Sequence, residues 1–248
     1  MHYSKLITKD QQLASLIHTD IELLSLLSRF DIKLGVGDKS IEEVCHKKNI
    51  SVDFFLEIVN IFHNKEYFPT AKLQSFSISL IVNFLKESHL FYNEELIPTI
   101  EELIHQLVWS GDDHDRNLKI LKKFFNEYRN EVKTHTKQEE ETVYPYTVFI
   151  EESCIKNKNI DDCYKKMQEY SITNYAEEHN NIEEKLTDLK NIIIKYLPPS
   201  DNQDIAYKIL NKLFKLEKDL NHHAAIEEKI LVPKIMEMEK KLKEITNN

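Results

Sequence analysis

The sequence predicts an all-α protein in which an antiparallel, up-down four-helix bundle follows a small helical domain. Only three Gly and six Pro occur among the 248 residues, so few tight turns are available. The composition is 41% hydrophobic and 30% charged, with long stretches rich in Glu, Lys, Leu and Ile, as is common in helices. Four long segments carry apolar residues at alternating spacings of three and four, which is typical of the seam of a bundle.

Residues 1–65 are expected to form a compact unit of short helices. The first apolar face comprises Leu13, Ile17, Leu24 and Leu27, and the glycines of the LGVGDKS segment end this run. Ser40 and Glu43 have the spacing of a capping box, and Ser51 can cap the next helix. No basic recognition face follows, so we expect a unit that docks a partner or mediates a homodimer. Residues 66–80 are interpreted as a connector to the bundle over residues 81–248.

Four apolar stripes define the expected bundle helices. The first comprises Ile81, Leu85, His89, Tyr92, Leu96, Ile100, Leu103 and Leu107, with a local bend expected at Pro98. The second comprises His114, Leu118, Leu121, Phe125, Tyr128, Val132, His135, Glu139 and Val143. The third comprises Ile172, Tyr175, His179, Ile182, Leu186, Leu189, Ile193 and Tyr196, and the fourth Leu213, Leu216, Leu220, His223, Glu227 and Ile230. Loops are expected near residues 111, 157–162 and 198–201, the second being the longest connection.

Six ionisable side chains occupy stripe positions where Leu or Ile would be expected. Burying such groups costs on the order of several kcal/mol unless something satisfies them. Residues four apart share a helix face, so an H-x-x-x-E pair offers an imidazole and a carboxylate to one point. A lone His followed by such a pair occurs twice, and a Pro follows each pair at the same distance. The sequence therefore predicts a metal site built from His89, His135, Glu139, His179, His223 and Glu227.

The H-x-x-x-E spacing alone is a weak signal in a chain with 11 His and 42 acidic residues. His18 with Glu22, and His179 with Glu183, show it too, and we interpret these as solvated pairs because their acids lie off the apolar stripes. For any single buried His, a hydrogen-bonded core residue is the alternative. Imidazole and carboxylate without thiolate suit iron, manganese or zinc, and two carboxylates able to bridge favour a dinuclear, reactive site.

The segments HTKQEEETVYP and HAAIEEKILVP resemble the paired signatures of hemerythrin-like di-iron domains. The N-terminal unit is similar to the small domain that precedes them in the iron-sulfur cluster repair (RIC) family. This resemblance implies two iron ions with an oxo or hydroxo bridge, held by the six residues above with Glu139 and Glu227 bridging. One departure concerns the family's adjacent Cys pair, because Gly35 and Val36 stand at its place and only Cys45 is kept. The thiol chemistry of that pair is therefore absent.

The resemblance implies a stress protein that helps to restore iron-sulfur clusters damaged by nitric oxide (NO) or oxidants. The centre would deliver iron or react with NO or O2, and damaged iron-sulfur proteins would be partners. The missing Cys pair favours an alternative, in which the centre binds O2 or NO reversibly and the N-terminal domain signals its state. A structural, zinc-loaded bundle is a third hypothesis. Whether the protein is an enzyme stays open, and no residue is assigned to catalysis.

Four residues beside the expected ligands are candidates for supporting them. Tyr92, Tyr128 and Tyr175 each lie one step from a ligand on the same stripe. Core packing is their default role, but a phenol can also donate a hydrogen bond to a bound oxygen species. His222 is expected at the surface, with support of the neighbouring ligand as the alternative.

Net charge and hydropathy restrict the possible partners and the expected location of the protein. A net charge of -9 argues against nucleic acid as a partner, since such binding depends on clustered cations. The N-terminus lacks an apolar core of signal-peptide length, and polar residues interrupt the longest apolar stretch, so we expect a cytoplasmic protein without a membrane segment. Cys154 and Cys163 are interpreted as free thiols, with a redox pair as the alternative.

Overall fold

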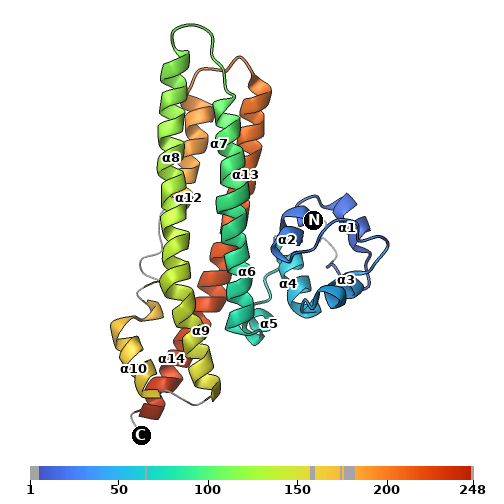
Figure 1. Ribbon diagram of the computed structural model, residues 1–248, viewed down its shortest axis with the longest axis vertical. Coiled ribbons are helices and arrows are strands. Elements are labelled where there is room, and N and C mark those ends of the chain that lie inside the picture. The colour runs from blue at the N-terminus through green and yellow to red at the C-terminus, as the bar shows by residue number, and fades with distance from the viewer. Residues whose placement is uncertain (1–5, 65, 157–159, 174, 176–181, 247–248) are drawn as a thin grey trace.

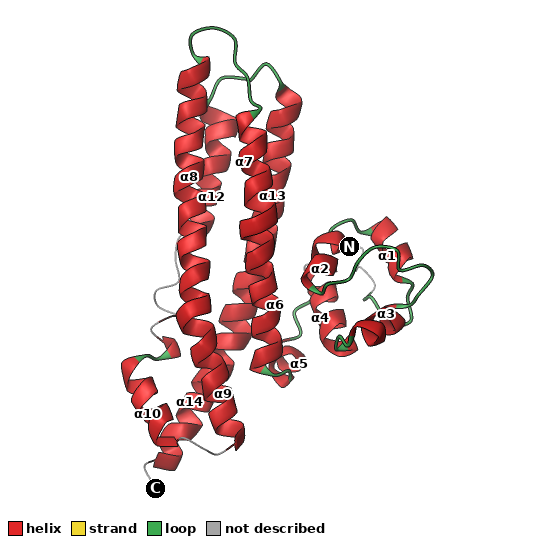
Figure 2. Ribbon diagram, in the orientation of Figure 1, coloured by secondary structure: helices red, strands yellow, loops and turns green. Residues whose placement is uncertain are grey.

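The computed structural model describes residues 6–64, 66–156, 160–173, 175 and 182–246. Helices and loops make up these residues, together with one isolated β-bridge between Gln12 and Ser40, and no strand occurs in these ranges (Figure 2). A long bundle stands beside a smaller, rounded N-terminal unit (Figure 1). The predicted all-α class is therefore confirmed. No helix in the described part of the chain has both the length and the apolar character needed to cross a membrane.

Four helical segments form the bundle. The first consists of α6 (Ile78–Leu90), η1 (Phe91–Leu96) and α7 (Ile97–His105), and the second of α8 (His114–Gln138), η2 (Glu139–Val143) and α9 (Tyr144–Lys156). The third contains α12 (Ile182–Asn191) and η3 (Ile192–Tyr196), and the fourth α13 (Gln203–Ile226), η4 (Glu227–Leu231) and α14 (Val232–Thr246). Helices α7 and α12 each contact both α8 and α13, so the four segments enclose a common core, as the sequence predicts (Figure 1).

Each bundle segment contains a π-helical turn (η1 to η4), which the sequence analysis does not predict. Single π turns inside α-helices are uncommon and are frequent at functional sites. The turns η2 and η4 begin at Glu139 and Glu227, and η1 begins two residues after His89. Pro98 follows η1 as the second residue of α7, where a missing N–H is tolerated. The local departure from α-helix therefore precedes Pro98, and the π turn takes the place of the expected proline bend.

The N-terminal unit contains α1 (Leu13–Thr19), α2 (Leu23–Arg29), α3 (Ile41–Lys48) and α4 (Val52–His63). The capping box of Ser40 and Glu43 is present, and Ser51 accepts a hydrogen bond from the Phe54 N–H, as predicted. The expectation for Leu24 was wrong, because this side chain is 37% exposed. A break between α1 and α2 turns the second helix so that Leu23 is buried instead.

Two expected loops contain helices. The connector at 66–80 holds α5 (Thr70–Ser75), and α6 already begins at Ile78, whose N–H donates to the buried Glu151 carboxylate at 2.8 Å. The predicted loop at 157–162 was also partly wrong, because α10 (Ile160–Glu169) begins within it. Helix α10 packs on α14 and α9 and carries the buried Cys163. The cysteines Cys45, Cys154 and Cys163 are free thiols, as expected.

The apolar core runs from the N-terminal unit into the bundle. Phe30, next to α2, stacks on Phe84 of α6 with ring centroids 5.6 Å apart. One buried cluster joins α1 to α6 with the lower part of the bundle, and a second fills the bundle between α7, α8, α12 and α13. His89, Glu139 and His223 lie along the chain between residues of the two clusters. The predicted domain limits at 65 and 81 stay a prediction, since the packing is continuous across them.

Candidate metal centre

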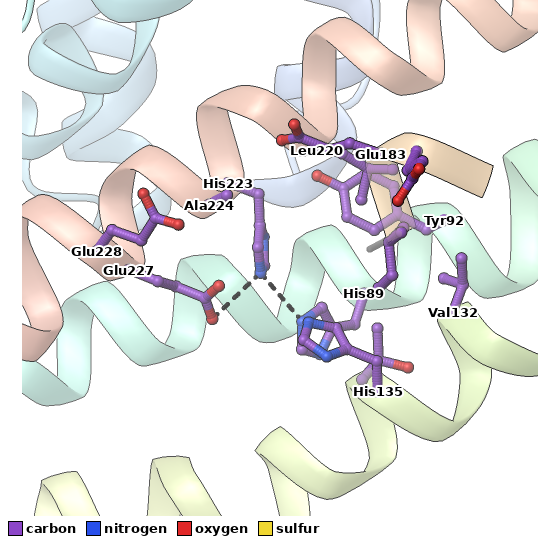
Figure 3. A pocket seen from close by; sticks show the side chains of 13 residues that line it. His89, Tyr92, Val132, His135, Glu183, Leu220, His223, Ala224, Glu227 and Glu228 are labelled. Atoms are coloured by element: carbon purple, nitrogen blue, oxygen red, sulfur yellow. Dashed lines mark hydrogen bonds and ion pairs between the residues drawn. The ribbon is translucent and has the colours of Figure 1, made fainter. Parts of the chain in front are cut away.

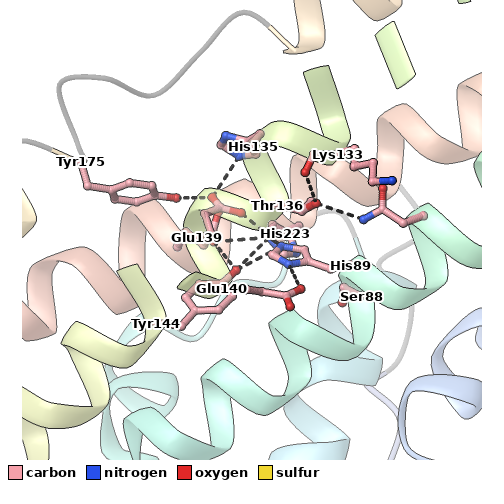
Figure 4. Close-up of polar contacts among 12 residues, drawn as sticks. Ser88, His89, Lys133, His135, Thr136, Glu139, Glu140, Tyr144, Tyr175 and His223 are labelled. Carbon is pink, nitrogen blue, oxygen red and sulfur yellow. Dashed lines mark hydrogen bonds and ion pairs between the residues drawn. The ribbon is translucent and has the colours of Figure 1, made fainter. Parts of the chain in front are cut away.

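Five of the six predicted ligands converge near the middle of the bundle (Figures 3 and 4). His135 Nε2 lies 2.9 Å from Glu139 Oε1, and His89 Nε2 lies 3.2 Å from Glu139 Oε2. On the facing helix, His223 Nε2 lies 3.3 Å from Glu227 Oε1 and 3.2 Å from His89 Nε2. The convergence follows from the i, i+4 spacing, which places each His and its Glu on one helix face. The sixth predicted ligand, His179, lies outside the described residues.

Three of these side chains form the tightest group. One ligand atom from each of His89, Glu139 and His223 lies within 4.8 Å of the other two, and all three residues are buried. Glu139 and Glu227 are each 1% exposed, and Oε2 of both has no hydrogen-bond partner among the described residues. Such orphaned acceptors are costly in a protein interior. Because imidazole and carboxylate suit iron, manganese or zinc, the residues present fit one or more metal ions.

Glu140 fixes the proton on His89. Its Oε1 lies 2.8 Å from His89 Nδ1, and a carboxylate can only accept, so Nδ1 carries the proton. The lone pair of Nε2 then faces Glu139 Oε2 at 3.2 Å. Two lone pairs at this distance need a proton or a cation between them, which is a second reason why the site fits a metal. Glu140 was not among the predicted site residues, and the one sequence feature that points to it is its position beside Glu139 and before the stripe residue Val143.

Electrostatics within the group keep the Glu139 carboxylate ionised. Burial alone would raise the pKa of Glu139, but its contacts with the His135 and His89 imidazoles hold it well below its usual range. Burial would lower the pKa of His135 and His223, yet Glu139 and Glu227 raise both. The site therefore stabilises positive charge beside its carboxylates, and metal ions can supply this charge once the imidazoles are deprotonated.

Tyr144 is the main residue that sequence analysis missed. Its hydroxyl donates to Glu227 Oε1 at 2.7 Å and lies 3.2 Å from His89 Nε2 (Figure 4). Burial and the nearby Glu227 raise the pKa of Tyr144 well above its usual value, so the phenol stays neutral and donates. Tyr144 directly precedes Pro145, whereas Val232 stands at the equivalent place before the second Pro. This difference between two otherwise matching segments was the sequence feature that could have identified Tyr144 as a site residue.

The four predicted supporting residues have different environments. Tyr175 donates from its hydroxyl to Glu139 Oε1 at 2.6 Å and thus contacts a predicted ligand. Tyr92 donates to Asp219 at 2.8 Å, and its ring centroid lies 5.8 Å from that of His223. Tyr128 is buried, but its hydroxyl has no hydrogen-bond partner within the described ranges. Its surroundings are those of a core residue.

The surface position expected for His222 was wrong. Its ring lies against Phe62 of α4, with centroids 4.4 Å apart. Burial lowers the pKa of His222. The side chain therefore lies between α13 and the N-terminal unit, and its contacts point away from the predicted ligands.

A cavity of about 470 Å³ adjoins the centre (Figure 3). His89, His135, His223 and Glu227 line it. Its lining also includes the apolar side chains of Val132, Ile182 and Leu220 and the exposed Glu183 and Glu184. The cavity is larger than a diatomic molecule requires, so a small ligand could reach a bound metal.

Comparisons with known proteins agree with this geometry. A family model described as "Hemerythrin HHE cation binding domain" matches residues 81–235. The "Iron-sulfur cluster repair protein ScdA" of Staphylococcus haemolyticus (strain JCSC1435) is 22% identical over 237 residues, which cover 92% of this chain and 99% of the relative. The predicted resemblance to hemerythrin-like proteins of the cluster-repair type is thereby confirmed, and the similarity extends beyond the bundle. This chain belongs to the family of hemerythrin HHE cation-binding domains.

Proposed function

We propose that the protein is a di-iron protein of the iron-sulfur cluster repair type, acting in the cytoplasmic response to NO or oxidative stress. The observation that carries this proposal is the convergence of two buried carboxylates, each with one orphaned oxygen, on three imidazoles. The proposed ligands are His89, His135, Glu139, His179, His223 and Glu227. The family match and the cluster-repair relative support the choice of iron and of repair.

The described residues have distinct roles in this proposal. Glu139 and Glu227 would hold the metal ions together with the imidazoles of His89, His135 and His223. Bound iron would supply redox chemistry and open coordination positions for O2 or NO. Tyr144 donates a hydrogen bond to Glu227, Tyr175 donates to Glu139, and both hydroxyls hold the carboxylates in place. The partners are O2, NO and damaged iron-sulfur proteins, and the N-terminal unit is proposed to dock a partner or a second copy of the chain.

A second function is a hemerythrin-like sensor that binds O2 or NO reversibly and signals through the N-terminal unit. The state of Cys45 favours it, because this thiol is the one cysteine of that unit and is fully buried. Burial raises the pKa of Cys45 to about 11, so the thiol is a poor nucleophile near neutral pH. A mechanism that needs thiol chemistry in the N-terminal unit is therefore disfavoured.

The first test is the iron content per chain of protein purified without added metal, with its visible spectrum before and after exposure to NO. About two irons and an oxo-bridge band that NO alters would support the proposal. Zinc alone, or an intact fold without metal, would contradict both functions. Glu139→Gln should lose the dinuclear centre. The matched control is Glu141→Gln, because Glu141 lies on the same turn but is exposed and pairs with Lys137.

A second measurement separates repair from sensing. Iron-loaded protein is mixed with a cluster protein that NO has damaged, and recovery of the cluster is followed by its absorbance. Recovery that depends on iron bound by this chain supports repair. A spectrum that changes with NO or O2 and returns when the gas is removed, without iron transfer, supports the sensor.

A further inference from the structure

A cationic side chain of the N-terminal unit is buried where that unit meets the bundle. Arg29, at the end of α2, is 5% exposed. Its Nη2 donates to Asp219 Oδ2 of α13 at 2.5 Å, and its Nη1 donates to Ser88 Oγ of α6 at 3.2 Å. The guanidinium carbon also lies 4.7 Å from the ring centroid of Phe91 and 5.5 Å from that of Tyr92. A buried charge is strongly destabilising without a paired opposite charge, so Arg29 and Asp219 each hold the other in place.

Asp219 joins this arginine to the metal centre. Its second oxygen, Oδ1, accepts a hydrogen bond from the Tyr92 hydroxyl at 2.8 Å. The Tyr92 ring is fully buried and meets the His223 ring edge to face, with centroids 5.8 Å apart and an interplanar angle of 68°. Three consecutive contacts therefore connect Arg29 of the N-terminal unit with a proposed ligand of the bundle.

His223 needs support of this kind. A ligating His usually donates its second ring nitrogen to a carboxylate or carbonyl, which fixes the direction of the ring. His89 has such a partner in Glu140. Nδ1 of His223 is buried and has no hydrogen-bond partner within the described residues. The direction of this imidazole therefore depends on its Nε2 contacts and on the rings packed against it, of which Tyr92 is one.

Further contacts place the N-terminal unit against the same turn of α13. Lys218 forms an ion pair with Glu22, next to α2, and the His222 ring packs on Phe62 of α4. Lys218 and His222 lie five residues and one residue before His223 in the sequence. The turn of α13 that leads into the proposed ligand is thus held by the N-terminal unit.

We propose that Arg29 is a positioning residue of the metal centre, which acts through Asp219 and Tyr92 on the direction of His223. Metal binding and docking of the N-terminal unit are then linked, because each stabilises the arrangement that the other requires. The inference rests on the proposed function, since it takes His223 as a ligand. It adds to that function a reason why the N-terminal unit matters although its Cys pair is missing.

The test is a double-mutant cycle with Co²⁺ affinity as the readout, measured from the visible absorption of Co²⁺ added to the metal-free full-length chain. Tyr92→Phe keeps the ring and removes the hydroxyl that binds Asp219. Arg29→Lys keeps the charge but loses the planar fork that reaches Asp219 and Ser88 together. Loss of a residue that orients a metal ligand weakens metal binding by roughly 10-fold to 100-fold. We expect each single variant to bind Co²⁺ about 10-fold more weakly.

The Co²⁺ affinity of the double variant, Tyr92→Phe with Arg29→Lys, decides the test. If Arg29 acts through the Tyr92 hydroxyl, Arg29→Lys should weaken binding little further once that hydroxyl is gone. Losses that multiply to about 100-fold, or an Arg29→Lys affinity within two-fold of the wild type, would overturn the inference. Glu42→Gln is the matched control, because its exposed ion pair with Lys9 lies within the N-terminal unit and involves no residue of the bundle. It should leave the Co²⁺ affinity unchanged.

Hydrogen exchange keeps the inference testable if Arg29→Lys does not fold. Co²⁺ should slow amide exchange in α2 of the wild type, and this protection should be lost in Tyr92→Phe. Equal exchange in α2 with and without bound Co²⁺ would contradict the link. A wild type that binds no Co²⁺ would instead overturn the proposed function itself, so the two failures are distinguishable.

Discussion

Replacing Glu139 by Gln changes the charge of the proposed bridge while keeping its shape. Glu139 Oε1 accepts from the Tyr175 hydroxyl at 2.6 Å and lies 2.9 Å from His135 Nε2, whereas Oε2 has no hydrogen-bond partner among the described residues. The Gln carbonyl can still accept from Tyr175. In the metal-free protein, one charge-assisted contact becomes a neutral one, a loss of about 1 kcal/mol. For a chain of 248 residues, this corresponds to a fall in Tm of about 2–4 °C.

Metal produces a much larger difference between the two proteins. Free metal at about 1,000 times its Kd stabilises a binding protein by about 4 kcal/mol, or about 8–16 °C in Tm for a chain of this size. The wild type should show this shift, and Glu139→Gln should lose most of it because a neutral amide is a poor bridge between two cations. The assay is a thermal melt with and without Fe²⁺ under anaerobic conditions, alongside metal analysis. A variant that keeps two metals per chain and the full shift would refute the assignment of Glu139 as a bridge.

Further predictions concern protonation, the missed tyrosine and the buried thiol. In the metal-free protein, the raised pKa of His135 adds to the free energy of unfolding below about pH 6.5, and this contribution is lost as the pH rises through the folded-state pKa. The lowered pKa of Glu139 adds to it above about pH 4.5, and this contribution is lost on acidification. Denaturant melts across this range should show both limbs, and a flat profile would contradict the coupling. Tyr144→Phe leaves Glu227 Oε1 without its donor, so it should cost about 1–3 kcal/mol in urea unfolding and shift the visible spectrum of the iron-loaded protein; an unchanged spectrum would exclude contact with the centre. Cys45→Ala should leave iron transfer within two-fold of the wild type, and a larger loss would show that this thiol takes part.

The period of an α-helix explains why the ligands could be predicted from the sequence. At about 100° per residue, positions four apart lie on one face, so His135 with Glu139 and His223 with Glu227 had to point together. The capping box at Ser40 was equally predictable, because it depends only on residues within one turn. In both cases, the spacing of residues within one or two helical turns was sufficient to predict the contact.

The same period explains why Tyr144 was missed. Five residues after Glu139, an α-helix would place Tyr144 about 140° away from the ligand face. The η2 turn changes this, because the Tyr144 N–H donates to the Glu139 carbonyl and returns position i+5 to that face. No local pattern used in the prediction distinguishes a π turn from an α turn. Arg29 was missed for a different reason, since its partner Asp219 is 190 residues away.

The shared core determines how the protein can be divided experimentally. A fragment limited to residues 81–235 would match the family model, yet it would remove Phe30 from its stack on Phe84 and Arg29 from Asp219. Leaving one member of a buried ion pair alone costs about 3–5 kcal/mol, against a total stability of about 5–15 kcal/mol for a typical domain. The same cut would remove Glu239, which accepts from the Tyr146 hydroxyl at 2.5 Å. We therefore expect the N-terminal unit and the bundle to unfold in one cooperative transition, and the isolated family region to aggregate.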